Sequence, residues 1–293
     1  MTRTACVIGL GSMGFGAATS LLRAGIAVRG VDRSPRALER FRAAGGATAA
    51  TPAEGAKGAE IVFVFVVNAE QTDEVLFGQG GAAAALAPGA IVAACATVPP
   101  AFAERLGERL AAMRLLMLDA PVSGGAAKAA SGEVTIMGGG SPEAFTQAEP
   151  FLQAISARVY RLGDTPGLGS RVKMINQLLA GVHLAAAAEA MALGARVGAK
   201  LDQLYEVIVN SAGSSWMFQN RAPHMIAGDF TPHSAVEIFV KDLGIVLETG
   251  KALDFPLPVA EAAFRQFAAA KAKGLGREDD AAVIKVYPEG GRQ

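Results

Sequence analysis

Over the first 160 residues, short apolar runs alternate with segments in which apolar positions recur every three to four residues. Short runs of branched and aliphatic residues are typical of buried strands, and longer periodic segments are typical of helices that cover a sheet. The predicted strands are 4–9, 27–32, 60–67, 90–95, 114–121, 133–139 and 157–163. The predicted helices between them are 13–25, 34–46, 70–77, 99–112 and 142–153. This alternation favours an α/β fold with a doubly wound, mostly parallel sheet of the Rossmann type.

The pattern changes after Gly163, where the turn-rich stretch GDTPGLG begins. Beyond it the periodicity is helical throughout, and no convincing strand is predicted. The predicted helices are 171–197, 201–211, 215–226, 233–252, 257–271 and 279–285. We therefore expect two domains, residues 1–163 with the sheet and residues 164–293 all-helical, the second entered through a long helix at about 170–197.

The first predicted strand runs into a glycine-rich turn that opens a helix. Gly9, Gly11 and Gly14 have the G-x-G-x-x-G spacing, and the strand–turn–helix context is what makes this spacing informative. The first glycine permits the tight turn, the second lets backbone approach a pyrophosphate, and the third lets helix and strand pack closely. The predicted pyrophosphate-binding residues are Gly9, Leu10, Gly11, Ser12, Met13 and Gly14.

The second predicted strand ends at Asp32, about twenty residues further on, where a carboxylate would accept hydrogen bonds from the adenine ribose. The same charge would repel a 2′-phosphate, so NAD is favoured over NADP. Arg33 and Arg36 leave NADP open, since either guanidinium could reach a 2′-phosphate. Three residues at later strand ends are candidates for the ribose and nicotinamide, or else ordinary turn and cap residues: Val67, Asn68 and Thr97.

A second glycine turn follows the strand at 114–121 and carries Ser123, Gly124 and Gly125. A hydroxyl followed by two glycines allows backbone N–H groups to converge on an anion such as a substrate carboxylate. A plain flexible loop is the alternative that the residues leave open.

Lys173 lies in the first turns of the long apolar helix, followed by Asn176 and Gln177. A lysine at a helix start commonly extends its ammonium group to water or pairs with an acid. Both the helix dipole and burial disfavour the ammonium form, and burial lowers the pKa of a lysine. A lysine so placed would therefore suit general acid–base catalysis, with the Gln177 amide on the same helix face to hold a substrate hydroxyl or carboxylate.

The amino-acid composition limits the kinds of molecule that the protein is expected to bind. Lys+Arg and Asp+Glu both number 27, and the formal net charge of zero does not suggest binding to nucleic acid or an anionic membrane. Polar residues within the long apolar helix argue for burial in protein instead of a membrane span. Cys6 and Cys95 do not form metal-ligand spacings, so no metal site is predicted, and two isolated thiols favour a reducing, cytoplasmic location without a signal peptide.

Four motifs occur in this order: GLGSMG at 9–14, DAPVSGG at 119–125, G-x-x-x-K at 169–173, and KDLG at 241–244. Together they resemble the β-hydroxyacid dehydrogenases over essentially the whole chain. The resemblance implies an NAD(P)-dependent enzyme acting on a small hydroxy acid, with Lys173 as catalytic acid/base. It also implies that the Ser-Gly-Gly turn binds the substrate carboxylate, that Thr97 and Lys241 contact the nicotinamide half, that Asp242 supports the site, and that the protein is a homodimer or homotetramer.

One position departs from the usual family pattern, because Gln177 stands where most members have asparagine four residues after the lysine. Together with the sequence around 177–198 and 210–248, the chain most resembles the L-threonate dehydrogenase branch. That branch implies oxidation of L-threonate to 2-oxo-tetronate in sugar-acid catabolism. Alternatives are a tartronate semialdehyde or glyoxylate reductase, a 3-hydroxyisobutyrate dehydrogenase, an imine reductase, or a dinucleotide-binding regulator without turnover.

Overall fold

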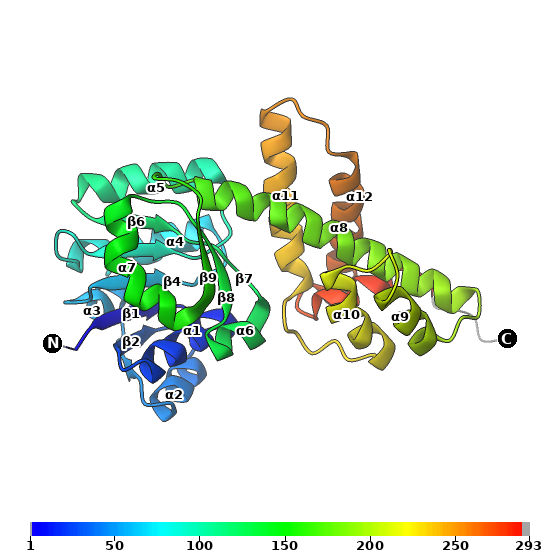
Figure 1. Cartoon of the computed structure of the whole chain (residues 1–293), viewed down its shortest axis with the longest axis horizontal. Coiled ribbons are helices and arrows are strands. Elements are labelled where there is room, and N and C mark those ends of the chain that lie inside the picture. Colours follow the sequence, from blue (N-terminus) through cyan, green and yellow to red (C-terminus); the bar gives the residue numbers. More distant parts are fainter. Residues whose placement is uncertain (1, 289–293) are drawn as a thin grey trace. The chain divides into compact units, whose positions relative to one another are not determined.

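The computed structural model describes residues 2–288, which form two compact units divided between Lys173 and Met174 (Figure 1). The first unit contains a six-stranded parallel sheet in the order β3-β2-β1-β4-β5-β6. Its strands are β1 (Thr4–Ile8), β2 (Ala27–Val31), β3 (Ala47–Thr48), β4 (Ile61–Val64), β5 (Ile91–Ala94) and β6 (Leu116–Asp119). The order reverses between β1 and β4, and in open parallel sheets this is where ligands bind, beyond the carboxyl ends of the strands.

Helices cover both faces of this sheet, which confirms the predicted doubly wound α/β fold. Successive residues of β1 point to opposite faces: Val7 packs with one apolar cluster and Ile8 with the other. One face is covered by α1 (Ser12–Arg23), α2 (Pro35–Ala43) and α7 (Pro142–Ile155). The other is covered by α3 (Pro52–Ala56), α4 (Ala69–Phe77) and α5 (Pro100–Ala112), with a short 3-10 turn at Ala83–Ala85.

The predicted strands at 133–139 and 157–163 exist, but they do not extend the main sheet. They form β8 (Val134–Gly138) and β9 (Ser156–Arg161) of a separate sheet, which begins with β7 (Val122–Ser123). β7 pairs antiparallel with β8, and it follows β6 after only two residues. Because a parallel neighbour needs a long crossover, so short a link cannot make β7 a further parallel strand of the six-stranded sheet. The segment after β7 forms α6 (Gly125–Ser131), where sequence predicted only a turn.

The second unit is helical over its described residues, as predicted. Helix α8 (Leu168–Arg196) starts in the first unit and continues into the second. It is followed by α9 (Leu201–Val209), α10 (Trp216–Ala227), α11 (Val236–Ala252), α12 (Pro258–Ala270), a π-helical turn at Lys271–Leu275 and a 3-10 helix at Asp280–Val286. Leu184, Met191, Phe239 and Phe267 lie at the centre of its core. By length and composition α8 could cross a membrane, a test that core helices of water-soluble proteins also pass.

A buried charge network joins α10 to the last 3-10 helix. The Arg221 guanidinium donates to both carboxylate oxygens of Asp280, and its Nε lies 3.8 Å from Asp279 Oδ1. Burial raises the pKa of the Asp280 carboxyl to about 6, against the opposing effect of Arg221. Because removing one partner would leave an uncompensated buried charge, this pairing ties the end of the described chain to the helical core.

Candidate active site

Two glycines of the first turn are required by close backbone contacts. Gly9 has φ +92°, and a Cβ there would lie 2.3 Å from the carbonyl oxygen of Phe65. A Cβ on Gly14 would lie 1.9 Å from the carbonyl oxygen of Gly9. Any side chain at either position would therefore force the β1–α1 turn apart.

Gly11 differs, because a Cβ there would meet none of the described atoms within 4 Å. It is the N-cap of α1, where no described side chain makes a capping hydrogen bond and the first turn holds no acidic residue. The first N–H groups of a helix and its positive dipole end favour an anion at this position. The turn therefore leaves space and donors where a dinucleotide pyrophosphate would bind.

Asp32 follows β2 and connects the glycine turn to the next helix. Its Oδ2 accepts a hydrogen bond from Leu10 N at 2.6 Å, and its Oδ1 accepts one from Ser34 N at 2.8 Å. The side chain is half-buried, and a carboxylate has about four acceptor positions, so acceptor capacity remains for a ribose hydroxyl. Arg33 and Arg36 are exposed, so neither side chain is packed in the core.

The other predicted cofactor residues of the first unit lie directly after β4 and β5. Val67 is 47% exposed, which is unusual for a valine next to a buried strand. The side-chain oxygen of Asn68 accepts a hydrogen bond from Gln71 N at 2.9 Å, so Asn68 is the N-cap of α4. Thr97 is half-buried between β5 and α5.

The Ser-Gly-Gly turn contains two consecutive glycines in conformations that other residues rarely adopt. Gly124 and Gly125 both have positive φ, +136° and +75°, and Gly124 is the N-cap of α6. Ser123 pairs with Thr135 across the antiparallel β7–β8 ladder. A strand thus delivers the serine to a turn whose conformation strongly favours glycine at the next two positions.

Asp119, the first residue of the DAPVSGG motif, was not singled out from the sequence. It is the last residue of β6 and is fully buried. Its Oδ2 accepts hydrogen bonds from Gly167 N at 2.9 Å and Ser170 N at 2.8 Å, and its Oδ1 accepts one from Ser170 Oγ at 2.7 Å. Burial raises the pKa of this carboxyl, while the hydrogen bonds from Ser170, Gly167 and Gly169 oppose that shift. Asp119 therefore caps the N-terminus of α8.

Lys173 lies on α8, one turn beyond this cap, and is only 6% exposed. Gly169 is four residues earlier, on the same face of the helix. A Cβ on Gly169 would lie 2.3 Å from the carbonyl oxygen of Met137 and 2.5 Å from that of Asp119. The G-x-x-x-K motif thus combines a glycine that allows α8 to approach β6 and β8 with a buried lysine on the same side.

In the second unit, four polar residues of α8 and α11 form a chain of contacts. Asn176 Nδ2 donates to Gln177 Oε1 at 2.9 Å, and Gln177 Nε2 donates to Asp242 Oδ2. Lys241 Nζ lies 2.7 Å from Asp242 Oδ1, and the carboxylate is only 2% exposed. Gln177 therefore binds a buried acid in addition to any role toward a ligand, and the sequence did not predict this contact.

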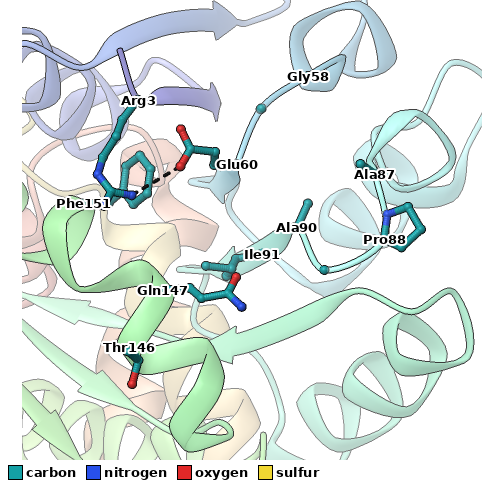
Figure 2. A pocket seen from close by; sticks show the side chains of 12 residues that line it. Arg3, Gly58, Glu60, Ala87, Pro88, Ala90, Ile91, Thr146, Gln147 and Phe151 are labelled. Carbon is teal, nitrogen blue, oxygen red and sulfur yellow. Dashed lines mark hydrogen bonds and ion pairs between the residues drawn. The ribbon is translucent and has the colours of Figure 1, made fainter. Parts of the chain in front are cut away.

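A separate hollow opens on the first unit, and Figure 2 shows its lining. It lies where β1, β4 and β5 begin, bordered by the Arg3–Glu60 ion pair, Pro88 and Phe151. These are the amino ends of the parallel strands, whereas the glycine turn, Asp119 and the Ser-Gly-Gly turn follow the carboxyl ends. The hollow is therefore not part of the candidate site.

Comparison with known proteins agrees with this geometry. Residues 4–163 match the family model described as the NAD binding domain of 6-phosphogluconate dehydrogenase. Residues 167–287 match the model described as NAD-binding of NADP-dependent 3-hydroxyisobutyrate dehydrogenase. The chain belongs to the β-hydroxyacid dehydrogenase family. It is accordingly an NAD(P)-dependent oxidoreductase that acts on hydroxy acids, and its first unit is an NAD-binding domain.

Several relatives in this family match over almost their full length. An L-threonate dehydrogenase of Cupriavidus necator is 60% identical over 98% of this chain and 97% of its own. An L-threonate dehydrogenase of Escherichia coli K12 is 52% identical over 96% and 93%. A crystal structure described as 3-hydroxyisobutyrate dehydrogenase from Salmonella typhimurium is 52% identical, with a TM-score of 0.93 over 97% of this chain and all of the other.

Within this dehydrogenase, the predicted residues fall into two groups. The glycine turn, Asp32, Val67, Asn68, Thr97, the Ser-Gly-Gly turn and Lys173 all belong to the first unit. Asn176, Gln177 and Lys241 belong to the second, where Asp242 links the latter two. Their roles toward substrate and cofactor remain predictions. Asp119 could have been found by one signal, an acid that ends an otherwise apolar strand four residues before Ser123.

Proposed function

We propose that this enzyme oxidises L-threonate to 2-oxo-tetronate with NAD as the oxidant. The observation that carries the proposal is the buried Lys173 on α8. The start of this helix is hydrogen-bonded to Asp119 at the end of β6, and Asp119 is four residues before the Ser-Gly-Gly turn. The 60% identity to a relative named L-threonate dehydrogenase supports this substrate over others of the family. NAD is preferred to NADP because Asp32 places a carboxylate at the end of β2.

In this mechanism Lys173 accepts the proton of the hydroxyl group at C2, and the C2–O bond becomes a carbonyl. NAD, when bound, would supply the acceptor for the hydride that leaves C2. Backbone N–H groups of the Ser123–Gly125 turn hold the substrate carboxylate. The Gly9–Gly14 turn and the first turn of α1 hold the pyrophosphate. Burial of Lys173 restricts water around the proton acceptor.

The proposal extends to the remaining predicted residues. Val67, Asn68 and Thr97, placed after β4 and β5, would border the ribose and nicotinamide. Asn176 and Gln177, one turn beyond Lys173, would bind the substrate hydroxyls, with the Gln177 amide oriented by Asp242. Lys241 would contact the nicotinamide half of the cofactor.

The decisive test is Lys173→Ala. We expect turnover to fall by at least about a thousandfold, within the range that general acid–base catalysis contributes, while NAD affinity stays within about twofold. Lys200→Ala, at the exposed position before α9, is the matched control and should retain full activity. Wild-type turnover in the folded Lys173→Ala variant would overturn the assignment of the base.

A substrate panel separates the chemical alternatives. The Salmonella structure is described as a 3-hydroxyisobutyrate dehydrogenase and is 52% identical to this chain, so 3-hydroxyisobutyrate is the main alternative substrate. L-threonate, glycerate and 3-hydroxyisobutyrate should each be measured with NAD and with NADP. We expect kcat/KM to be highest for L-threonate with NAD, since a site built to bond several hydroxyls discriminates against analogues that lack them. A higher value for 3-hydroxyisobutyrate would replace the substrate assignment and leave the reaction class intact.

We further propose that the enzyme is a cytoplasmic homodimer or homotetramer. Helix α8 presents an apolar stripe to solvent, in which Val172, Ile175, Leu179 and Leu193 are each 42–61% exposed. Contiguous apolar side chains on a protein surface often mark association surfaces. Light scattering should give a mass of two or four chains, and Leu179→Glu should reduce it. A monomeric wild-type protein at micromolar concentration would contradict the oligomer.

A further inference from the structure

We propose that Asp119 is a positioning residue for Lys173, holding the first turn of α8 so that the lysine stays in register with the Ser-Gly-Gly turn. The inference rests on the proposed role of Lys173 as the proton acceptor. It concerns residues of the first unit only, Met1–Lys173.

The contacts of Asp119 fix it through both backbone and side chain. Its N–H and C=O exchange hydrogen bonds of 2.9 Å with Gly139. Its carboxylate receives two backbone N–H groups and one hydroxyl from the α8 entry, at Gly167 and Ser170. A side chain with this many short bonds in a dry environment has a single well-defined position.

The same residue also precedes the carboxylate-binding turn by four positions along the chain. β6 ends at Asp119, and the chain reaches Ser123 through Ala120, Pro121 and the first residue of β7. Asp119 thus connects the two sequence motifs that the mechanism uses, one through the covalent chain and the other through hydrogen bonds. No other described carboxylate caps α8.

The helix transmits this constraint to Lys173. Ser170 is three residues before Lys173, about 4.5 Å along the axis of an α-helix. Gly169 allows the close approach that these hydrogen bonds need, since a Cβ there would lie within 2.5 Å of two backbone carbonyl oxygens. We call the three hydrogen bonds from Gly167 and Ser170 to the Asp119 carboxylate the clamp. Without it, the first turn of α8 would become less fixed, and a displacement of about 1 Å at a catalytic group costs about a hundredfold in rate.

Two variants test the clamp with little change in volume. Asp119→Asn keeps the shape and the acceptor for the two backbone N–H groups, but it removes the negative charge that strengthens those bonds and replaces the acceptor of the Ser170 hydroxyl with an NH2 group. Ser170→Ala removes only the hydroxyl bond. We expect kcat to fall 10- to 100-fold in each, with the Kd for NAD within about twofold of wild type. Ser141→Ala is the matched control, because Ser141 caps α7 of the same unit through Ala144 N. It should lose similar stability and keep kcat.

A double-mutant cycle distinguishes positioning from a general structural role. Residual turnover of Lys173→Ala should be raised to a measurable rate by added methylamine, which replaces the lost amine. If Asp119 acts through Lys173, adding Asp119→Asn to Lys173→Ala should leave the amine-independent residual turnover unchanged, because the effects are not additive. Additive losses, or wild-type kcat in folded Asp119→Asn and Ser170→Ala, would overturn the inference. Full turnover of Lys173→Ala alone would instead overturn the proposed function.

Discussion

Asp32 and Asp119 occupy equivalent places at the carboxyl ends of two parallel strands, β2 and β6, yet their surroundings differ. Each accepts backbone N–H groups from a glycine-containing turn: Asp32 from Leu10, and Asp119 from Gly167. Asp32 is half-buried and binds two backbone N–H groups. Asp119 is fully buried and binds two N–H groups and a hydroxyl.

The difference shows how one residue type at one topological position serves two purposes. A half-buried carboxylate with free acceptor positions can still bind a ligand. A fully buried carboxylate that accepts three hydrogen bonds from the protein organises the residues around it, and removing it leaves those partners unsatisfied. Asp32 is therefore placed to hold the cofactor, and Asp119 to hold the helix that carries the proposed base.

The largest expected effect is on stability. Asp119→Ala leaves Gly167 N, Ser170 N and the Ser170 hydroxyl without their acceptor, at about 1–3 kcal/mol for each buried donor. We expect the free energy of unfolding of the first unit to fall by about 3–5 kcal/mol, against about 1 kcal/mol for Asp32→Ala. Urea unfolding followed by circular dichroism measures both. Equal losses would remove the distinction between the two acids.

The glycines beside these acids should separate in the same way. Gly169→Ala places a Cβ against two backbone carbonyl oxygens, and overpacking of this kind costs about 1–3 kcal/mol. Gly11→Ala meets no described atom within 4 Å and should leave stability within about 0.5 kcal/mol, while weakening NAD binding. Thermal unfolding and fluorescence titration with NAD should show opposite outcomes for the two variants. Intact NAD affinity in Gly11→Ala would contradict the pyrophosphate site.

A smaller effect is expected on cofactor choice. Asp32→Ala removes the proposed acceptor for the ribose hydroxyls, and hydrogen bonds to a charged group are worth about 1.5–3 kcal/mol. NAD affinity should therefore fall at least about tenfold, and the preference for NAD over NADP should narrow. Glu39→Ala, exposed on α2, is the control for loss of a nearby negative charge. If Asp32→Ala leaves the preference for NAD over NADP unchanged, residues other than Asp32 must discriminate between the two cofactors.

The smallest effect concerns the two thiols. Burial raises the pKa of the Cys6 thiol to about 12. Burial also raises the pKa of the Cys95 thiol, and the charge of Asp119 raises it too. Neither should react with Ellman's reagent at pH 8 in the native enzyme, and both should react in denaturant. Rapid labelling of Cys95 in native protein would show that the region around Asp119 opens to solvent.

Much of the fold was predictable because its signals are local. Apolar runs identified the six-stranded sheet's main strands, and helical periodicity identified the second unit. The glycine turn was recognisable because Gly9, Gly11 and Gly14 follow a strand and open a helix. The placement of β7, β8 and β9 in a separate sheet was not predictable, since it depends on pairing between segments and not on the character of each one.

The candidate site divides along the same line. The spacing of its motifs along the chain suffices to nominate Lys173 and the Ser-Gly-Gly turn. The contacts of Asp119 with residues 48 and 51 positions away, and of Gln177 with Asp242 65 positions away, leave no periodic or spacing signal. A carboxylate's role depends on its burial and partners, which only the packed structure decides.

The amino-acid sequence by itself determined the alternation of strands and helices, the glycine positions where backbone must approach closely, and the chemical types at the motifs. The tertiary structure decided which of two strand-end aspartates stays accessible and which is buried against α8. The physical reason is that local conformation and backbone freedom are properties of neighbouring residues. Desolvation and hydrogen-bond saturation, in contrast, arise only when distant segments pack together.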